Sequence, residues 1–104
     1  MFLVSAIYLN HEGSRFDATY YLEIHRPMVV GLLAPHGFKS LRLVRGVAAL
    51  DGSMAPYRMI AEMHFESREG FEQGMQEHGE VIMGDAANYT DIEPVLQVGE
   101  LLVT

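Results

Sequence analysis

Alternating apolar and polar positions predict four β-strands in this chain. They fall at residues 2–9, within 38–50, at 57–66 and within 92–103. The segment 57–66 alternates most regularly, which predicts a core-facing side made of Tyr57, Met59, Ala61, Met63 and Phe65. Pro94 lacks a backbone donor, so the last strand is predicted to begin at an edge of the sheet.

Apolar residues spaced four apart predict a helix after the first strand. Ser14 and Asp17 form a variant of the capping box. Pro27 removes a backbone donor and crowds the carbonyl of Glu23, so this helix is predicted to kink or change course there. Its predicted apolar face holds Phe16, Tyr20, Ile24 and Met28.

A second helix is predicted between the last two strands. Ser67 can cap its N-terminus, and Glu69 suits the positive end of the helix dipole. Its apolar face has 4-3-4 spacing and holds Phe71, Met75, His78 and Ile82. Three glycines within it are expected to weaken the helix, namely Gly70, Gly74 and Gly79.

The predicted order of elements is therefore βαββαβ. Two βαβ-type halves around one antiparallel sheet give an α+β, ferredoxin-like fold with both helices on one face. The other face is left bare, and a single domain of 104 residues has too little chain to cover it. We therefore expect a homodimer that pairs sheet against sheet through the face bearing Arg58, Ile60, Glu62 and His64.

Composition then narrows the classes of function. Seven basic and fourteen acidic side chains give a net charge of −7, which disfavours nucleic acid and anionic membrane surfaces as partners. No apolar run approaches the ~20 residues that cross a bilayer, and the first four residues lack the basic start of a signal peptide. The chain has no cysteine for a disulfide or a thiolate metal site, so a reducing cytoplasm is the expected compartment.

The first predicted helix also carries the candidate chemistry, in the pattern FDxxYYxxxHxP over residues 16–27. On a helical wheel with Phe16 at 0°, Tyr21 falls at about 140° and His25 at about 180°. His25 is thus predicted at the edge of the apolar face, one turn after Tyr21, where the helix passes from core to cleft.

This motif, the Asn88-Tyr89-Thr90 segment before Pro94 and the Val98-Gly99-Glu100 ending resemble the EthD proteins over nearly the whole chain. The resemblance identifies residues 1–104 as one EthD-like domain of the dimeric α+β barrel superfamily. It implies a ferredoxin-like protomer, a homodimer built by joining sheets into a barrel, and a small apolar cavity between sheet and helices. EthD proteins take their name from ethyl tert-butyl ether degradation, where they occur beside a cytochrome P450 system.

A histidine that faces such a cavity is a candidate general acid or base, because its ordinary pKa lies near working pH. We therefore predict His25 as a catalytic residue, with Tyr21 orienting it or holding an oxygen of the ligand. The alternative is structural, in which the two side chains satisfy each other or a backbone carbonyl freed at Pro27. The expected ligand-binding residues are Tyr20, Met28, Met63, Phe65 and Tyr89.

The remaining histidines offer weaker candidates for metal sites. His64 lies between Glu62 and Glu66 on the expected dimer face, where ion pairs account for it more simply. His78 could ligate haem, as a helical histidine does in haem-degrading members of the superfamily, but the chain has no tryptophan to flank the macrocycle. His11 and His36 are expected in solvated loops. With no phosphate-binding loop either, we predict neither metal nor cofactor.

The leading hypothesis is an EthD-like protein that binds a small, apolar, oxygen-bearing molecule and catalyses a cofactor-free acid/base or oxygenation reaction in the catabolism of xenobiotics or of aromatic or polyketide-like compounds. The main alternative is a non-catalytic binding or accessory protein that supports an oxygenase system. A third is a structural dimer with a filled core. Superfamily relatives include cofactor-independent monooxygenases, isomerases and polyketide cyclases, so the fold does not choose among these.

Overall fold

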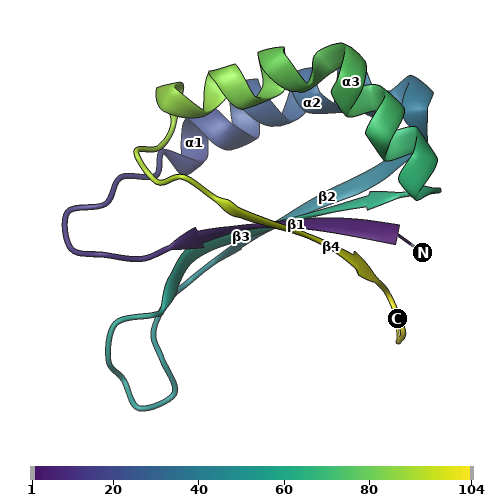
Figure 1. The fold of residues 1–104 in the computed structure, drawn as a ribbon. Coiled ribbons are helices and arrows are strands. Elements are labelled where there is room, and N and C mark those ends of the chain that lie inside the picture. Colours follow the sequence, from purple (N-terminus) through teal and green to yellow (C-terminus); the bar gives the residue numbers. More distant parts are fainter. Residues whose placement is uncertain (1, 104) are drawn as a thin grey trace.

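Strands and helices follow one another in the predicted βαββαβ order (Figure 1). The computed structural model describes residues 2–103. The strands are β1 (Phe2–Leu9), β2 (Phe38–Arg45), β3 (Tyr57–Phe65) and β4 (Val95–Glu100). The first helical region consists of α1 (Ala18–Tyr20), a π-helical turn η1 (Tyr21–His25), α2 (Arg26–Leu33) and a 3₁₀ turn η2 (Ala34–His36), and the second of α3 (Arg68–Gly84) and a 3₁₀ turn η3 (Asp85–Asn88).

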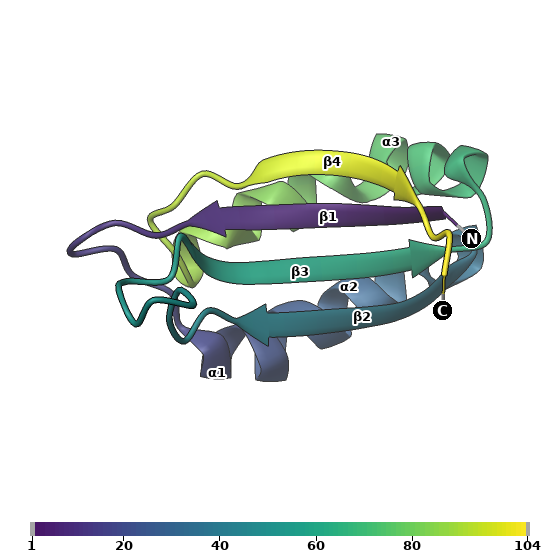
Figure 2. The same cartoon turned by 90° about the horizontal axis from the view of Figure 1, so that it is seen from below.

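The strands of residues 2–103 form a four-stranded antiparallel sheet in the order β2-β3-β1-β4. Ala6 of β1 lies opposite Ala61 of β3 on one side and opposite Leu96 of β4 on the other. All the helices lie on one face of this sheet, and the opposite face is bare (Figures 1 and 2). The predicted ferredoxin-like α+β fold is thus confirmed, with β2 and β4 as the edge strands.

The core lies between the sheet and the helices and is divided into two clusters. The cluster beneath η2 and the start of α3 contains Val4, Val29, Leu33, Phe65 and Ile82. The other, towards η1 and η3, is rich in tyrosine and contains Ala6, Tyr8, Phe16, Tyr21, Met59, Ala61, Tyr89 and Ile92. The predicted inner side of β3 is buried at Met59, Ala61 and Phe65, whereas Tyr57 at the strand's beginning is 41% exposed.

The buried face of the first helical region differs from the predicted one. Tyr21, His25, Val29 and Leu33 face the core, and Ile24 is 54% exposed. The prediction was wrong because Phe16 precedes the helix and pairs with Thr90 in an isolated β-bridge, so it does not share the helix's face. The helix begins later than expected, with Asp17 rather than Ser14 as the cap that accepts a hydrogen bond from the Tyr20 amide.

The predicted irregularity at Pro27 takes the form of the π-helical turn η1. In this turn the Arg26 amide donates to the carbonyl of Tyr21, five residues back. A wider turn gives room where the proline ring would otherwise press on the carbonyl four residues earlier. The chain therefore continues as α2 directly after η1, with Pro27 in its first turn.

The glycines of α3 allow close contact with the first helical region. Ser67 caps α3 as predicted, by accepting a hydrogen bond from the Gly70 amide at 3.1 Å. A Cβ at position 74 would lie 2.8 Å from Cδ2 of Leu33, closer than side chains can approach. A glycine makes α3 intrinsically less stable than an alanine would. At position 74 it also lets α2 and α3 pack directly against each other.

The bare face of the sheet mixes apolar and charged side chains. Val44 and Val95 on its two edge strands are 43% and 51% exposed. Arg42 of β2 forms an ion pair with Glu62 of β3, directly opposite it. Within residues 2–103, no helix is both long and apolar enough to cross a bilayer.

Candidate functional site

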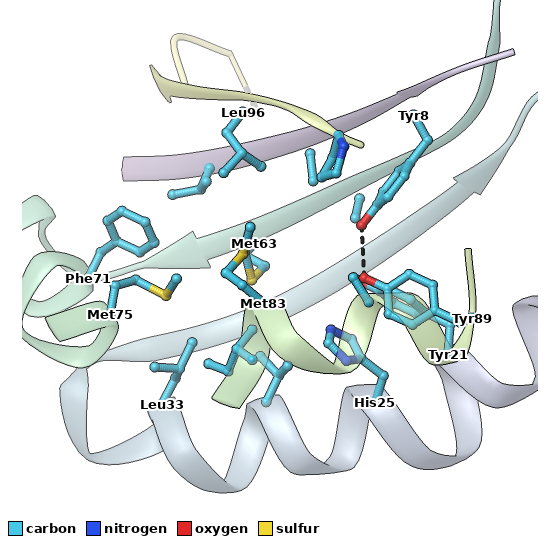
Figure 3. Close-up of a pocket in the computed structure, with 17 residues that line it drawn as sticks. Tyr8, Tyr21, His25, Leu33, Met63, Phe71, Met75, Met83, Tyr89 and Leu96 are labelled. Carbon is cyan, nitrogen blue, oxygen red and sulfur yellow. Dashed lines mark hydrogen bonds between the residues drawn. The ribbon is translucent and has the colours of Figure 1, made fainter. Parts of the chain in front are cut away.

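A cavity opens between the helices and the sheet and contains about 620 Å³ of empty volume, part of it open to solvent. Figure 3 shows tyrosine side chains and His25 at one end and Phe71, Met75 and Leu33 at the other. One end can therefore form hydrogen bonds, whereas the other offers only apolar contacts. Such a cavity suits a small molecule with a polar head and an apolar body.

Aromatic rings from four segments surround the polar end. Tyr21 and His25 of η1 lie one turn apart, with ring centroids 4.9 Å from each other. Tyr89, which follows η3, packs against both rings, and its hydroxyl lies 3.1 Å from the hydroxyl of Tyr8 in β1 (Figure 3). Phe16 lies against Tyr21 and closes the cluster on the side of the β-bridge. These contacts fix the orientation of each ring.

His25 is held by a carboxylate from the other helical region. Its Nδ1 lies 2.8 Å from Oδ2 of Asp85, the first residue of η3. Both side chains are shielded from water, with 6% of His25 and 14% of Asp85 exposed. In the neutral imidazole that suits this contact, Nδ1 carries the proton and its N–H donates a hydrogen bond to the carboxylate, so the lone pair is on Nε2.

Asp85 stays ionised because it receives several hydrogen bonds. Its Oδ1 accepts one from the Tyr20 hydroxyl at 2.7 Å and one from the Asn88 amide at 2.9 Å. Burial favours the neutral acid, but the hydrogen bonds from Asn88, Tyr20 and His25 outweigh it, and the pKa of Asp85 is lowered. The carboxylate therefore remains an acceptor for His25 at neutral pH.

Two polar atoms at this end have no protein partner. Among residues 2–103, neither Nε2 of His25 nor the hydroxyl of Tyr21 receives or donates a hydrogen bond, although the two residues are only 4% and 3% exposed. Both residues line the cavity. No side-chain nitrogen or oxygen among the described residues is both buried and unpaired, so these two atoms keep accessible surface at the cavity and can reach an oxygen or a proton of a bound molecule.

The phenols around His25 remain protonated at any physiological pH. Burial raises the pKa of the Tyr21 hydroxyl and that of the Tyr89 hydroxyl well above the usual range. The pKa of Tyr8 is raised by burial as well. Tyr21 can thus donate a hydrogen bond to a ligand but is a poor base.

Beyond its polar end the cavity is lined by apolar side chains, several of them methionines. Met75 of α3 lies beside Phe71 at the far end, and Met63 of β3 lies nearer the middle of the cavity, next to Met83 (Figure 3). Methionines adapt to ligands of different shape because their chains are unbranched. At the margin, Leu96 of edge strand β4 and Met83 of α3 are 51% and 46% exposed, so the opening lies between these elements.

Comparison with known proteins identifies the family. A family model of the EthD domain matches residues 14–93. The crystal structure of an EthD-like protein from Ralstonia eutropha JMP134 is 37% identical and superposes with a TM-score of 0.91, covering 98% of this chain and 92% of the other. The chain belongs to the EthD family. No curated protein is significantly similar to it.

More distant structures share the fold of this EthD protein. One is a dimeric ferredoxin-like protein from an uncultured marine organism, at 13% identity and a TM-score of 0.63, with 100% of this chain and 97% of the other covered. Another is a mutant form of SnoaB, a cofactor-independent oxygenase from Streptomyces nogalater, at 13% identity and a TM-score of 0.59, with 99% and 93% covered. Identities this low indicate a common fold only.

Four of the predicted site residues line the cavity of this EthD protein, namely Tyr21, His25, Met63 and Tyr89. The other three lie elsewhere. Tyr20 binds Asp85 from outside the cavity, Met28 is half-buried against the core, and Phe65 is fully buried within it.

Sequence reasoning missed Asp85 and Tyr8. Asp85 directly follows Gly84 at the end of the second predicted helix, and its acidic side chain at that break was the available signal. Tyr8 is on the inward side of β1, next to Ala6 and Val4 in the same alternation. Its neighbours gave no sign that its hydroxyl meets Tyr89.

The other histidines lie outside the cavity lining. His78 is half-buried and directed towards Glu77, so it does not face the cavity as a haem ligand would. His64 is on the bare face of the sheet, opposite Leu3 of β1. His36 is not solvated as expected, because its Nε2 lies 2.7 Å from Oε2 of Glu77 and its side chain is only 16% exposed.

Proposed function

We propose that this EthD protein binds a small, largely apolar, oxygen-bearing molecule in the cavity and that His25 transfers a proton to or from it without a bound cofactor. The observation that carries the proposal is the unpartnered Nε2 of His25, which belongs to a residue lining the cavity at its polar end while Nδ1 is fixed by Asp85. A buried imidazole oriented by a carboxylate is a common arrangement for a general base.

The residues support a division of roles in proton transfer. Nε2 of His25 accepts a proton from a C–H or O–H group of the substrate, and the electron pair left behind moves towards the substrate's oxygen. The Tyr21 hydroxyl donates a hydrogen bond to that oxygen and stabilises its negative charge. Asp85 stabilises the imidazolium, which returns the proton in the second half of the reaction.

This chemistry suits enols, phenols and ketones with an apolar body, the classes found in the catabolism of xenobiotics and of aromatic or polyketide-like compounds. The same deprotonation would prepare an electron-rich substrate for oxygenation by dioxygen. SnoaB, which shares the fold, is a cofactor-independent oxygenase, and this likeness is an argument from fold alone. The cysteine-free composition favours a reducing compartment such as the cytoplasm for the reaction.

The test begins with a search, by native mass spectrometry and extraction, for a small molecule that is retained through purification. That molecule, or a ketone of matching size with a C–H group next to its carbonyl, is then incubated with wild-type protein in deuterated water. His25-dependent exchange of an acidic C–H proton for deuterium supports the proposal, and an equal exchange rate in His25→Gln contradicts it.

A second candidate function is binding without turnover, in support of an oxygenase system. The apolar end favours it, because a wall that includes Met63, Met75 and Met83 suits sequestration of varied hydrophobic molecules. The two functions differ in one measurement. A binding protein would show saturable affinity for the retained molecule and no exchange or product at all.

We also propose that the protein is a homodimer joined through the bare face of the sheet. A related fold is described as dimeric, and this face exposes apolar side chains that a single chain leaves uncovered. Arg42 and Glu62 already pair with each other on this face, which reduces the cost of burying their charges in an interface.

A further inference from the structure

A second group of ligating side chains lies where η2 meets α3, away from the cavity. It consists of His36 at the end of η2 with Glu77 and His78 of α3, whose ligand atoms all lie within 4.8 Å of one another. Nε2 of His36 is 2.7 Å from Oε2 of Glu77, and Nε2 of His78 is 4.0 Å from the same oxygen. Two imidazole nitrogens therefore converge on one carboxylate oxygen.

Two glycines of α3 leave the space that His36 occupies. A Cβ at position 74 would lie 3.2 Å from both Cβ and Cγ of His36, and one at position 70 would lie 2.3 Å from the His36 carbonyl oxygen. Only a helix surface without side chains at these two positions lets η2 approach so closely. The position of His36 is thus set by packing, and its side chain is only 16% exposed.

A contact between one imidazole and one carboxylate accounts for only part of this arrangement. It includes His36 and Glu77, but it does not require His78 to direct Nε2 at the same oxygen. Around a zinc ion with ligand bonds near ~2.1 Å, tetrahedral geometry separates the ligand atoms by about 3.4 Å. The two observed separations, 2.7 and 4.0 Å, lie on either side of that value. Glu77 is 61% exposed, so its side chain has room to reorient around an ion, and the two imidazole nitrogens lie within 4.8 Å of each other.

We propose that His36, Glu77 and His78 bind one divalent transition-metal ion, with zinc as the reference ligand and water completing the coordination. Two imidazoles and one carboxylate match zinc, cobalt, nickel and copper, whereas magnesium and calcium prefer oxygen ligands. The chain's net charge of −7 also favours cations.

The ion joins η2 to α3 and is separate from the chemistry of His25. None of its three ligands lines the cavity. Leu33, however, both lines the cavity and contacts Gly74, on the same surface of α3 that His36 covers. An ion that binds only the folded state stabilises that state. Metal binding therefore stabilises the contact between η2 and α3 behind one wall of the cavity.

The test is a zinc titration of tag-free, chelator-treated protein in competition with a chromogenic chelator. We expect one zinc per chain, and at least ~10-fold weaker binding in each of His36→Ala, His78→Ala and Glu77→Gln, since even residues that only orient metal ligands change affinity by 10–100-fold. The matched controls are His11→Ala, an exposed loop histidine, and Glu80→Gln, an exposed acid of α3. Both should bind as the wild type does.

Cobalt substitution gives a direct readout that does not depend on activity. A visible d–d spectrum typical of nitrogen and oxygen ligands should appear with one equivalent of Co²⁺ and should be lost in His78→Ala, whose half-exposed side chain can be removed without unfolding the protein. Zinc binding that is equally tight in His36→Ala and His78→Ala, or no stoichiometric binding by the wild type, would overturn the proposal. The proton exchange assigned to His25 should be unaffected by either result.

Discussion

The Nδ1 atom of His25 lies 2.8 Å from Oδ2 of Asp85, although the two residues are 60 positions apart in the chain. This bond connects the π-helical turn of the first helical region to the 3₁₀ turn after the second. It leaves Nε2 of His25 as the one ring nitrogen that can meet a molecule in the cavity.

Replacing His25 by glutamine should abolish proton exchange or turnover. The same change should weaken binding of an oxygen-bearing ligand by about 1–3 kcal/mol, the usual cost of a lost buried hydrogen-bond partner. Asp85 keeps its bonds from Tyr20 and Asn88, so the melting temperature should change little. If calorimetry shows unchanged ligand affinity together with a melting temperature lower by several degrees, His25 has a structural role only.

Replacing Asp85 by asparagine should make the free energy of unfolding less dependent on pH in acid. The lowered pKa of Asp85 means that its carboxylate stabilises the folded state above the ordinary pKa of ~3.9, and that this contribution is lost as the pH falls through the lowered value. Urea unfolding from pH 7 down to about pH 2 measures the effect, because the loss begins near the ordinary pKa and continues below it. The variant should lose less stability than the wild type over this range; parallel profiles would contradict the assignment. Glu93→Gln, which removes the charge of an exposed carboxylate outside the cavity lining, is the control for a general charge effect.

Replacing Tyr8 or Tyr89 by phenylalanine should each destabilise the protein by about 1 kcal/mol, because each change leaves the opposite hydroxyl without its partner. The double variant should cost clearly less than the sum of the two single changes, since it removes both hydroxyls together. Denaturant unfolding of all four proteins gives the coupling energy. Strict additivity would mean that the 3.1 Å contact contributes nothing.

Replacing Gly74 by alanine should destabilise the protein by about 1–3 kcal/mol, because the new Cβ meets Leu33 and His36 in a packed junction. Gly31→Ala in α2 is the matched control. A Cβ there meets nothing within 4 Å, so the change should stabilise the protein by roughly 0.4–1 kcal/mol through helix propensity and reduced freedom of the unfolded chain. Thermal unfolding distinguishes the two, and a stabilising Gly74→Ala would show that the junction is loosely packed.

Replacing Ile60 by aspartate should convert the proposed dimer to a monomer, because the new charge would be buried in the centre of the paired sheets. Sedimentation at micromolar concentration measures the change. Val47→Asp, in the loop after β2 and 89% exposed, should remain dimeric. A wild-type protein that sediments as a monomer would refute the proposed interface, which is expected to bury well over ~1,000 Å².

Local patterns were sufficient to predict the strands, the βαββαβ order and the cap at Ser67. They also located the irregularity at Pro27, because a missing backbone donor acts within one helical turn. They assigned the wrong buried face to the first helix, because the starting residue of a helical wheel decides its phase. Phe16 belongs to a β-bridge, and this could be known only once Thr90 was placed beside it.

The sequence by itself determined which side chains of the site came from one helix, since Tyr21 and His25 are a single turn apart and must share a face. Tertiary structure alone brought Asp85 to His25, Tyr8 to Tyr89, and His36 to Glu77 and His78. Each of these contacts depends on how closely two helices or a helix and a strand approach. That distance depends on the side-chain volumes on both sides of the contact, and the lack of a side chain at Gly74 is one example. The periodicity of a single segment therefore cannot predict it.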